Sequence, residues 1–168
     1  MTIHVIGCTH FGHKNIIEAC NRPFPDLASQ DFFLKREWNS VVKPQDTVFH
    51  LGDFAWPHRD QKAYDHYRKG LNGQIVQVQG NHDPKGVGED IIEVKLNKTR
   101  IVLCHYPLLD WNQRERGAVH LHAHTHKKSF KSGFRRGNVG ADAIHFKPMK
   151  LEDVLEILLQ DPIGDSYR

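Results

Sequence analysis

Histidine, asparagine, aspartate and cysteine recur in this chain directly after short apolar runs. In one such place, Gly80-Asn81-His82-Asp83 follows the β-branched run 74–79. The glycine permits a tight bend, and the polar side chains behind it could supply a neutral oxygen ligand, a proton donor and a partner that orients the donor. A Gly-Asn turn with a capping aspartate is the structural alternative, and these four residues alone do not separate the two interpretations.

Four further segments repeat this pattern of an apolar run that ends in residues able to bind metal ions. Polar groups need partners when they are buried, so five such endings in one chain are hard to explain by packing alone. The chain also has 13 histidines, and neutral imidazole is the commonest metal ligand. The pattern therefore indicates a metal site. The four segments are 3–10, 47–53, 100–105 and 119–126.

The composition favours a globular protein of one domain, which we expect to span residues 1–168. Charged residues make up 26% of the chain and the formal net charge is +3, which argues against stable binding of duplex DNA. Three cysteines without a repeated spacing do not form a disulfide framework, so we expect a reducing compartment. We find no secretory or membrane-spanning pattern, and we expect a cytoplasmic protein without a membrane partner, or a phage or viral protein made in the cytoplasm.

The elements that must position these residues are predicted from apolar periodicity. Strands alternate with helices in the first half of the chain, and two strands then pair as a hairpin across Asn97-Lys98. This order predicts an α/β sandwich with mixed sheets. The basic segment 127–138 is expected to be an exposed turn, and Trp38 is expected in the core. Predicted strands begin at 3 and 119 and cover 47–51, 74–79, 91–96 and 99–104; predicted helices cover 16–20, 27–42, 59–70 and 151–159.

Taken together, the polar endings resemble the five signature motifs of the calcineurin-like metallophosphoesterases. The resemblance covers nearly the whole chain and is strongest to the small single-domain bacterial and phage members. It implies two facing mixed β-sheets flanked by helices, two metal ions at the strand ends, and hydrolysis of phosphomonoesters or phosphodiesters. The matching residues are Cys8-Thr9-His10, Gly52-Asp53, Gly80-Asn81-His82-Asp83, His105 and Ala123-His124-Thr125-His126.

The resemblance also implies a set of ligands for two metal ions. A carboxylate suits a bridging position because it offers two oxygens and a negative charge, and Asp53 would be that bridge. The ions would be iron, zinc or manganese, and a hydroxide that they share would attack the phosphorus in line. The implied ligands are Cys8, His10, Asp53 and His126 for one ion and Asp53, Asn81, His105 and His124 for the other.

Residues next to these motifs are assigned to the phosphate ester. By the resemblance, His82 faces the phosphate and assists the leaving group, and Asp83 is expected to hold the His82 ring in one tautomer. His13 could contact the substrate, with a surface-loop histidine as the alternative. Arg22 is a weaker candidate for binding phosphate, with a structural corner beside Pro23 as the alternative.

Cys8 stands where the family normally has an aspartate. We favour a thiolate ligand, because the other ligands are retained and a cysteine next to a dication is readily deprotonated. The alternatives are a site that has lost its first metal ion and an introduced substitution. A thiolate predicts that iron or zinc is favoured over manganese or magnesium. Ala123 stands where the family usually has glycine. Because glycine tolerates backbone angles that alanine does not, the local backbone angle is in doubt here, but the ligands are not.

Three histidines outside the matching motifs, His50, His120 and His122, are predicted to be core residues or to orient ligands, and His4, His58, His66 and His145 stay unassigned. On the last histidine-rich strand, His120 and His122 share a face with His124 and His126 but do not match the motif. His50 precedes Asp53 on its strand and is interpreted in the same way.

The expected reaction is hydrolysis of a phosphodiester, with a nucleotide or another small phosphate ester as the substrate. Basic side chains near the last motif could hold a nucleotide or a single strand. Two alternatives stay open: a nuclease acting on single-stranded nucleic acid, and an impaired family fold that serves as a binding module. The oligomeric state also stays open. The basic side chains are Lys127, Lys128, Lys131, Arg135 and Arg136.

Overall fold

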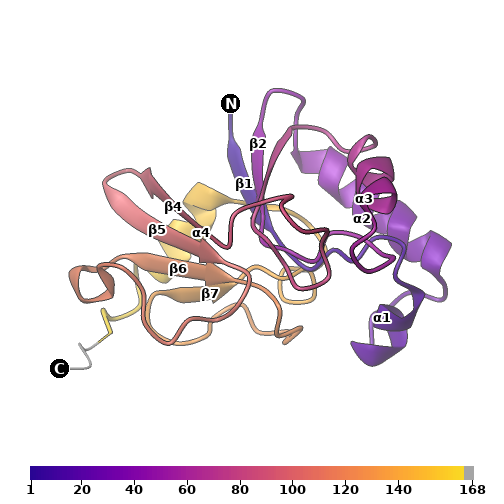
Figure 1. Cartoon of the computed structure of the whole chain (residues 1–168). Helices are drawn as coiled ribbons and strands as arrows, with labels where there is room; N and C mark the ends of the chain where they lie inside the picture. Colours follow the sequence, from indigo (N-terminus) through magenta and orange to yellow (C-terminus); the bar gives the residue numbers. More distant parts are fainter. Residues whose placement is uncertain (165–168) are drawn as a thin grey trace.

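The structure, a computed structural model, describes residues 1–164 and contains two four-stranded sheets (Figure 1). The first sheet consists of β3 (Gln74–Gln77), β2 (Thr47–His50), β1 (Ile3–Ile6) and β8 (Met149–Lys150), in that order. The first three strands are parallel and β8 is antiparallel to β1. Because β1, β2 and β3 run in the same direction, their carboxyl ends lie at one edge of the sheet.

The second sheet consists of β4 (Ile91–Leu96), β5 (Thr99–Cys104), β6 (Val119–His122) and β7 (Arg136–Asn138), in that order. β4 and β5 form the predicted hairpin, and its two turn residues, Asn97 and Lys98, both have a positive φ, as a primed two-residue turn requires. β5, β6 and β7 are parallel. Their carboxyl ends therefore also lie at one edge.

Helices α2 (Leu27–Val41) and α3 (Gln61–Arg68) lie side by side beside the first sheet (Figure 1), where the hydroxyl of Tyr67 donates to Asp31. α2 begins where the Asp26 side chain accepts the amide of Ser29, and it buries Trp38 in the core. The other helices are α1 (Lys14–Ala19), a 3₁₀ turn at Arg114–Arg116, and α4 (Leu151–Leu158), which packs against β1, β7 and β8. Across residues 1–164, no helix combines the length and the apolar character needed to cross a bilayer.

The predicted fold class is confirmed, since two mixed sheets are flanked by helices. The prediction for the basic segment is wrong at its end, because residues 136–138 form β7 instead of an exposed turn. Gly137 and Asn138 are buried there, and a Cβ on Gly137 would lie 2.9 Å from a methyl carbon of Leu158. A three-residue strand of Arg, Gly and Asn has no apolar alternation, so periodicity could not detect it.

The three histidines of β2 and β6 are buried. The ring of His50 contacts the Thr9 hydroxyl at 3.0 Å and the Gln77 amide at 3.3 Å. The ring of His120 lies 2.9 Å from the Val102 carbonyl oxygen and accepts the amide of Leu108. His122 is similarly buried against Ser132. The structure places these histidines in the core, which is one of the two roles predicted for them.

We expect the free energy of unfolding to fall as the pH falls below about 6.5, because burial lowers the pKa of His50 to about 3 and that of His120 to about 4. Both values lie below the ordinary value of 6.5, so the unfolded chain takes up these protons first and the stabilisation is lost as the pH falls towards 4. For His120 alone the loss is roughly 3 kcal/mol. Urea unfolding at a series of pH values, with a chelator present, measures it. His120→Gln should lower the pH dependence and the exposed His66→Ala should not; an unchanged pH dependence in His120→Gln contradicts the prediction.

Candidate metal centre

The predicted ligands lie in loops that follow parallel strands of both sheets. Cys8 and His10 follow β1, Asp53 follows β2, and Asn81 follows β3, all at the same edge of the first sheet. His105 follows β5. His124 and His126 follow β6, so both sheets contribute to one cluster.

Asp53 lies at the centre of this cluster. One carboxylate oxygen, Oδ2, lies 3.6 Å from Nε2 of His10 and 3.4 Å from Nε2 of His105. The other oxygen accepts the amide of His82 at 2.9 Å. Burial by itself raises the pKa of this carboxyl group, but the contacts with His105 and His10 and the amide of His82 outweigh burial and lower it. The carboxylate is therefore ionised, with one oxygen close to a ring nitrogen from each predicted ligand set.

On one side of Asp53, the ligand atoms of Cys8, His10 and His126 lie within 4.8 Å of one another. Cys8 is fully buried and its sulfur accepts the amide of His124 at 3.1 Å. Burial raises the pKa of the thiol, so a thiolate here depends on a neighbouring cation. The structure thus brings together the side chains of the first predicted ligand set.

On the other side, Nε2 of His105 lies 3.1 Å from both the Asn81 amide oxygen and Nδ1 of His124. The second ring nitrogen of His105 contacts the Leu51 carbonyl oxygen at 2.7 Å, which fixes the orientation of the ring. Burial lowers the pKa of His124. These contacts bring the second predicted set together around Asp53.

The donor atoms fit divalent metal ions of the first transition row. Nε2 of His10 is buried without a hydrogen-bond partner among the described residues, and burial holds the pKa of this ring well below its usual range. A neutral imidazole nitrogen without a hydrogen-bond partner is free to bind a metal ion through its lone pair. Imidazole, carboxylate, amide and sulfur donors together suit zinc, iron or manganese.

The backbone at the ligands adopts an uncommon conformation. Cys8, His10, Asp53, His124 and His126 all have φ values between 50° and 59°, the left-handed region that non-glycine residues seldom occupy. Such angles persist only where the surrounding structure holds them, and they cluster at functional sites.

Gly52 and Gly80 lie where the loop that carries Asp53 meets the loop that carries Asn81. A Cβ on Gly52, where φ is +83°, would overlap the ring of His105 and the backbone of Gly80. The two glycines therefore let the Asp53 loop and the Asn81 loop lie against each other. Ala123, which stands where the family usually has glycine, does not have a positive φ. Alanine therefore adopts the backbone conformation at this position without strain.

Asp83 does not orient His82, and the prediction that it does is wrong. Its carboxylate is buried and accepts the backbone amides of Asp53, Phe54 and Gly80 at 2.8–2.9 Å. The ring of His82 instead contacts His58, with 3.1 Å between the two Nδ1 atoms. Asp83 therefore holds the backbone of Asp53, while His82 is half-buried.

His13 lies beside the first ligand set. Its Nδ1 is 3.3 Å from Nδ1 of His10, and its ring stacks on Trp56 with 4.2 Å between ring centres. The position is compatible with a substrate contact and with orienting His10. The contact with substrate stays a prediction.

Arg22 has a structural role, which decides between the two interpretations of this residue. Its buried guanidinium binds both carboxylate oxygens of Asp142, at 3.0 and 2.9 Å, and donates to the carbonyl oxygens of Cys8 and Thr9. All of these partners are internal, so Arg22 fixes the loop that carries the first ligands and does not bind phosphate.

Asp142 is a site residue that the sequence analysis did not assign. Its carboxylate contacts Nδ1 of His126 at 2.9 Å as well as Arg22. Burial alone lowers the pKa of His126, but hydrogen bonds with Asp142, Cys20 and Cys8 outweigh burial and raise it to about 12. Asp142 thus orients a predicted ligand. The five polar endings that indicate the site do not include Asp142, so the sequence pattern does not identify it.

Part of the basic segment is held by contacts within the chain. Arg135 donates to the carbonyl oxygen of Gly117, and Arg136 donates to that of Leu108. Lys131 forms an ion pair with Asp161 at 2.6 Å. Three of the five predicted cations are therefore engaged within the chain.

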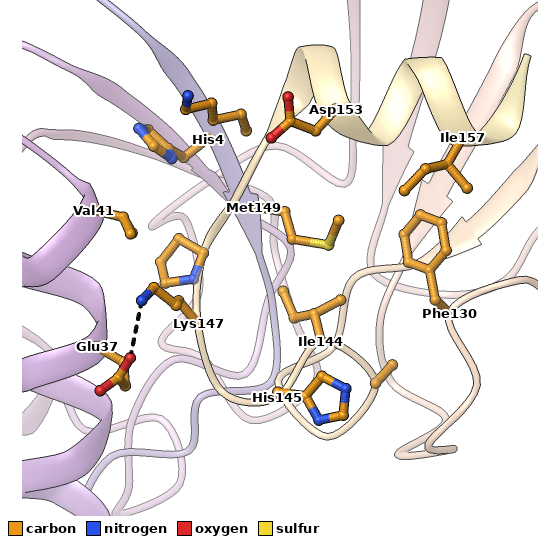
Figure 2. Close-up of a pocket in the computed structure, with 13 residues that line it drawn as sticks. His4, Glu37, Val41, Phe130, Ile144, His145, Lys147, Met149, Asp153 and Ile157 are labelled. Carbon is orange, nitrogen blue, oxygen red and sulfur yellow. Dashed lines mark ion pairs between the residues drawn. The ribbon is translucent and has the colours of Figure 1, made fainter.

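Two hollows differ in their relation to the ligands. A polar hollow of about 400 Å³ opens beside Asn81 and is lined by Arg59 and Lys85. A second groove, of about 690 Å³, lies between α2 and α4, where Figure 2 shows the Glu37–Lys147 ion pair at one side. Its lining residues include none of the predicted ligands.

The fold and the ligand cluster together define a metal-binding sandwich of two β-sheets. Residues 1–142 match the calcineurin-like phosphoesterase superfamily domain. The chain therefore belongs to the calcineurin-like phosphoesterase superfamily, whose members are metal-dependent phosphoesterases.

The chain resembles several other proteins over most of its length. It is 33% identical to an uncharacterized protein of Methanocaldococcus jannaschii, covering 93% of this chain and 90% of the relative. It is 27% identical to the gene 66 protein of Mycobacterium phage L5, covering 80% and 83%. A protein of unknown function from Aquifex aeolicus has a similar structure, with a TM-score of 0.69, 24% identity, and coverage of 93% and 98%. Vps29 of Entamoeba histolytica, in a structure complexed with Zn²⁺, has a TM-score of 0.50 and 20% identity, with coverage of 83% and 73%.

Proposed function

We propose that this protein is a phosphodiesterase that depends on two metal ions and acts on nucleotides or other small phosphodiesters. The observation that carries the proposal is the Asp53 carboxylate, whose Oδ2 lies within 3.6 Å of ring nitrogens from both ligand sets. A carboxylate in this position is suited to bridge two cations. Family membership supports the broader part of the proposal, that the chain is a metal-dependent phosphoesterase.

The residues of the site divide into three roles. Cys8, His10, Asp53 and His126 would hold one ion and Asp53, Asn81, His105 and His124 the other, and the bound pair supplies an activated water and positive charge next to the phosphoryl group. His82 lies beside His10, with 5.5 Å between the ring centres, so that it can donate a proton to the leaving oxygen. Arg59 and Lys85 line the neighbouring hollow beside the carboxylates of Asp83, Glu89 and Asp90, and they would be the groups there that contact the phosphate of the substrate.

The experiment that tests this function is hydrolysis of bis(4-nitrophenyl) phosphate and 4-nitrophenyl phosphate by the full chain after addition of Mn²⁺, Fe²⁺ or Zn²⁺. The proposal expects turnover that requires metal and is faster on the diester. Elemental analysis of the same samples reports how many ions are bound. Two bound ions without turnover of either ester would refute the proposed activity and favour a binding module.

We expect Cys8→Asp to change which metal ion the site prefers. The substitution replaces a buried sulfur donor with a hard oxygen donor, so affinity for Mn²⁺ should rise relative to Zn²⁺ by about tenfold or more. Competition between the two ions, followed by elemental analysis, measures the ratio, and Cys104→Ala controls for loss of a buried thiol. An unchanged ratio would show that Cys8 is not a ligand. Turnover that appears only in Cys8→Asp would identify the natural site as impaired.

A further inference from the structure

His82 needs a partner that fixes its ring, and Asp83 does not provide one. The closest polar contact to the His82 ring is Nδ1 of His58, at 3.1 Å. The two rings meet edge to face, with 5.1 Å between their centres and 80° between their planes. One ring nitrogen must therefore donate and the other accept, so the tautomer of one ring depends on the other.

The segment that carries His58 is fixed at several points. The amide of Arg59 donates to the carbonyl oxygen of His82 at 2.8 Å, which ties the two segments together by their backbones. On one side of His58, the amide of Trp56 donates to the carbonyl oxygen of Phe11. On the other side, Asp60 caps α3 by accepting two amides of its first turn. His58 is exposed, but its backbone is held by its surroundings.

The surroundings of His82 also show which of its nitrogens is free to meet a substrate. The ring lies 5.5 Å from that of the predicted ligand His10 and 6.2 Å from that of His13, so it faces the ligand cluster. Because Nδ1 is engaged by His58, the nitrogen that remains for a substrate is Nε2. This is the arrangement that a general acid needs, with one nitrogen anchored and the other presented.

We propose that His58 is the positioning residue for His82. This inference rests on the proposed function: His58 accepts a hydrogen bond from the Nδ1–H group of a protonated His82. As a water-derived oxygen bonds to phosphorus and the bond from phosphorus to the leaving oxygen breaks, Nε2 of His82 gives its proton to that leaving oxygen. His82 then keeps the proton at Nδ1 and remains hydrogen-bonded to His58. The imidazole of His58 thus occupies the place predicted for the carboxylate of Asp83.

The first test uses leaving groups of different quality. A diester with an alcohol leaving group needs a proton donor, whereas 4-nitrophenolate leaves without one. His58→Ala should therefore lower kcat about tenfold to a hundredfold on the alkyl ester, leave KM unchanged, and have little effect on the nitrophenyl ester. His58→Asn keeps an acceptor and should restore part of the rate; His66→Ala, an exposed histidine of α3, is the matched control. An equal loss on both esters would overturn the inference.

The second test does not depend on turnover. ¹⁵N NMR of the histidine rings in the full chain, with and without Zn²⁺, should show the Nδ1–H form of neutral His82 and a mixture of tautomers in His58→Ala. An unchanged tautomer in the variant overturns the inference, even if the protein hydrolyses both esters. If the wild-type chain hydrolyses neither ester but the tautomer changes as expected, the proposed activity fails and the positioning role stands.

Discussion

Asp53→Asn is expected to abolish binding of both metal ions and to reduce hydrolysis of a phosphodiester by at least about a thousandfold. The carboxylate is ionised and shares one oxygen between His10 and His105, and an amide offers one neutral oxygen in place of two charged ones. Asparagine tolerates the left-handed backbone found here, so the loop should keep its shape. Elemental analysis after incubation with Mn²⁺ or Zn²⁺, and rates with bis(4-nitrophenyl) phosphate, measure the two effects.

The matched control for this substitution is Asp65→Asn, on the exposed face of α3, where the carboxylate accepts a hydrogen bond from Gln61. It should bind metal and hydrolyse substrate like the wild-type chain. If Asp53→Asn retained two ions per chain, Asp53 would not be the bridge. The assignment of the whole site would then be lost.

Asp142→Ala is expected to lower the free energy of unfolding by about 3–5 kcal/mol. The substitution leaves the guanidinium of Arg22 buried without its carboxylate partner, and that side chain has essentially no exposed surface. It also removes the partner of Nδ1 of His126, so metal affinity should fall about tenfold to a hundredfold. Urea unfolding and metal titration of the same variant measure the two effects separately.

An exposed ion pair provides the comparison for this result. Asp161→Ala removes the partner of Lys131, whose side chain is half exposed, and should cost less than about 1 kcal/mol. Equal losses in the two variants would mean that burial of Arg22 does not determine the cost. Unchanged metal affinity in Asp142→Ala would show that His126 is not a ligand or does not depend on Asp142.

Local patterns predict the helices and strands wherever a periodic apolar pattern exists. The helix at 27–41 has such a pattern, and the hairpin at Asn97-Lys98 has a turn that fits its backbone. β7 and β8 have no such pattern because they are short and are formed by pairing with β6 and β1. Strands of this kind depend on the neighbouring strand rather than on their own residues, so the sequence of the segment does not reveal them.

The predicted ligands could be found from sequence because each follows a strand, and parallel strands bring their ends together. Their partners could not be found in this way. Asp142 reaches His126 and Arg22 from a segment far along the chain, and Asp83 turns towards backbone amides that no motif specifies. The contact between His58 and His82 depends on the path of a loop, which residue types do not encode.

The left-handed backbone at Cys8, His10, Asp53, His124 and His126 also has a consequence for how this protein can change over time. Each such angle costs on the order of 1–3 kcal/mol, and at each position glycine would remove the strain together with the donor atom. Selection for a firmer fold alone would therefore favour glycine at these positions, and only a continuing need for the donor atoms opposes it. In a duplicate of this protein that no longer needs the site, these five residues should be replaced early, and each replacement by glycine should raise the stability of the fold.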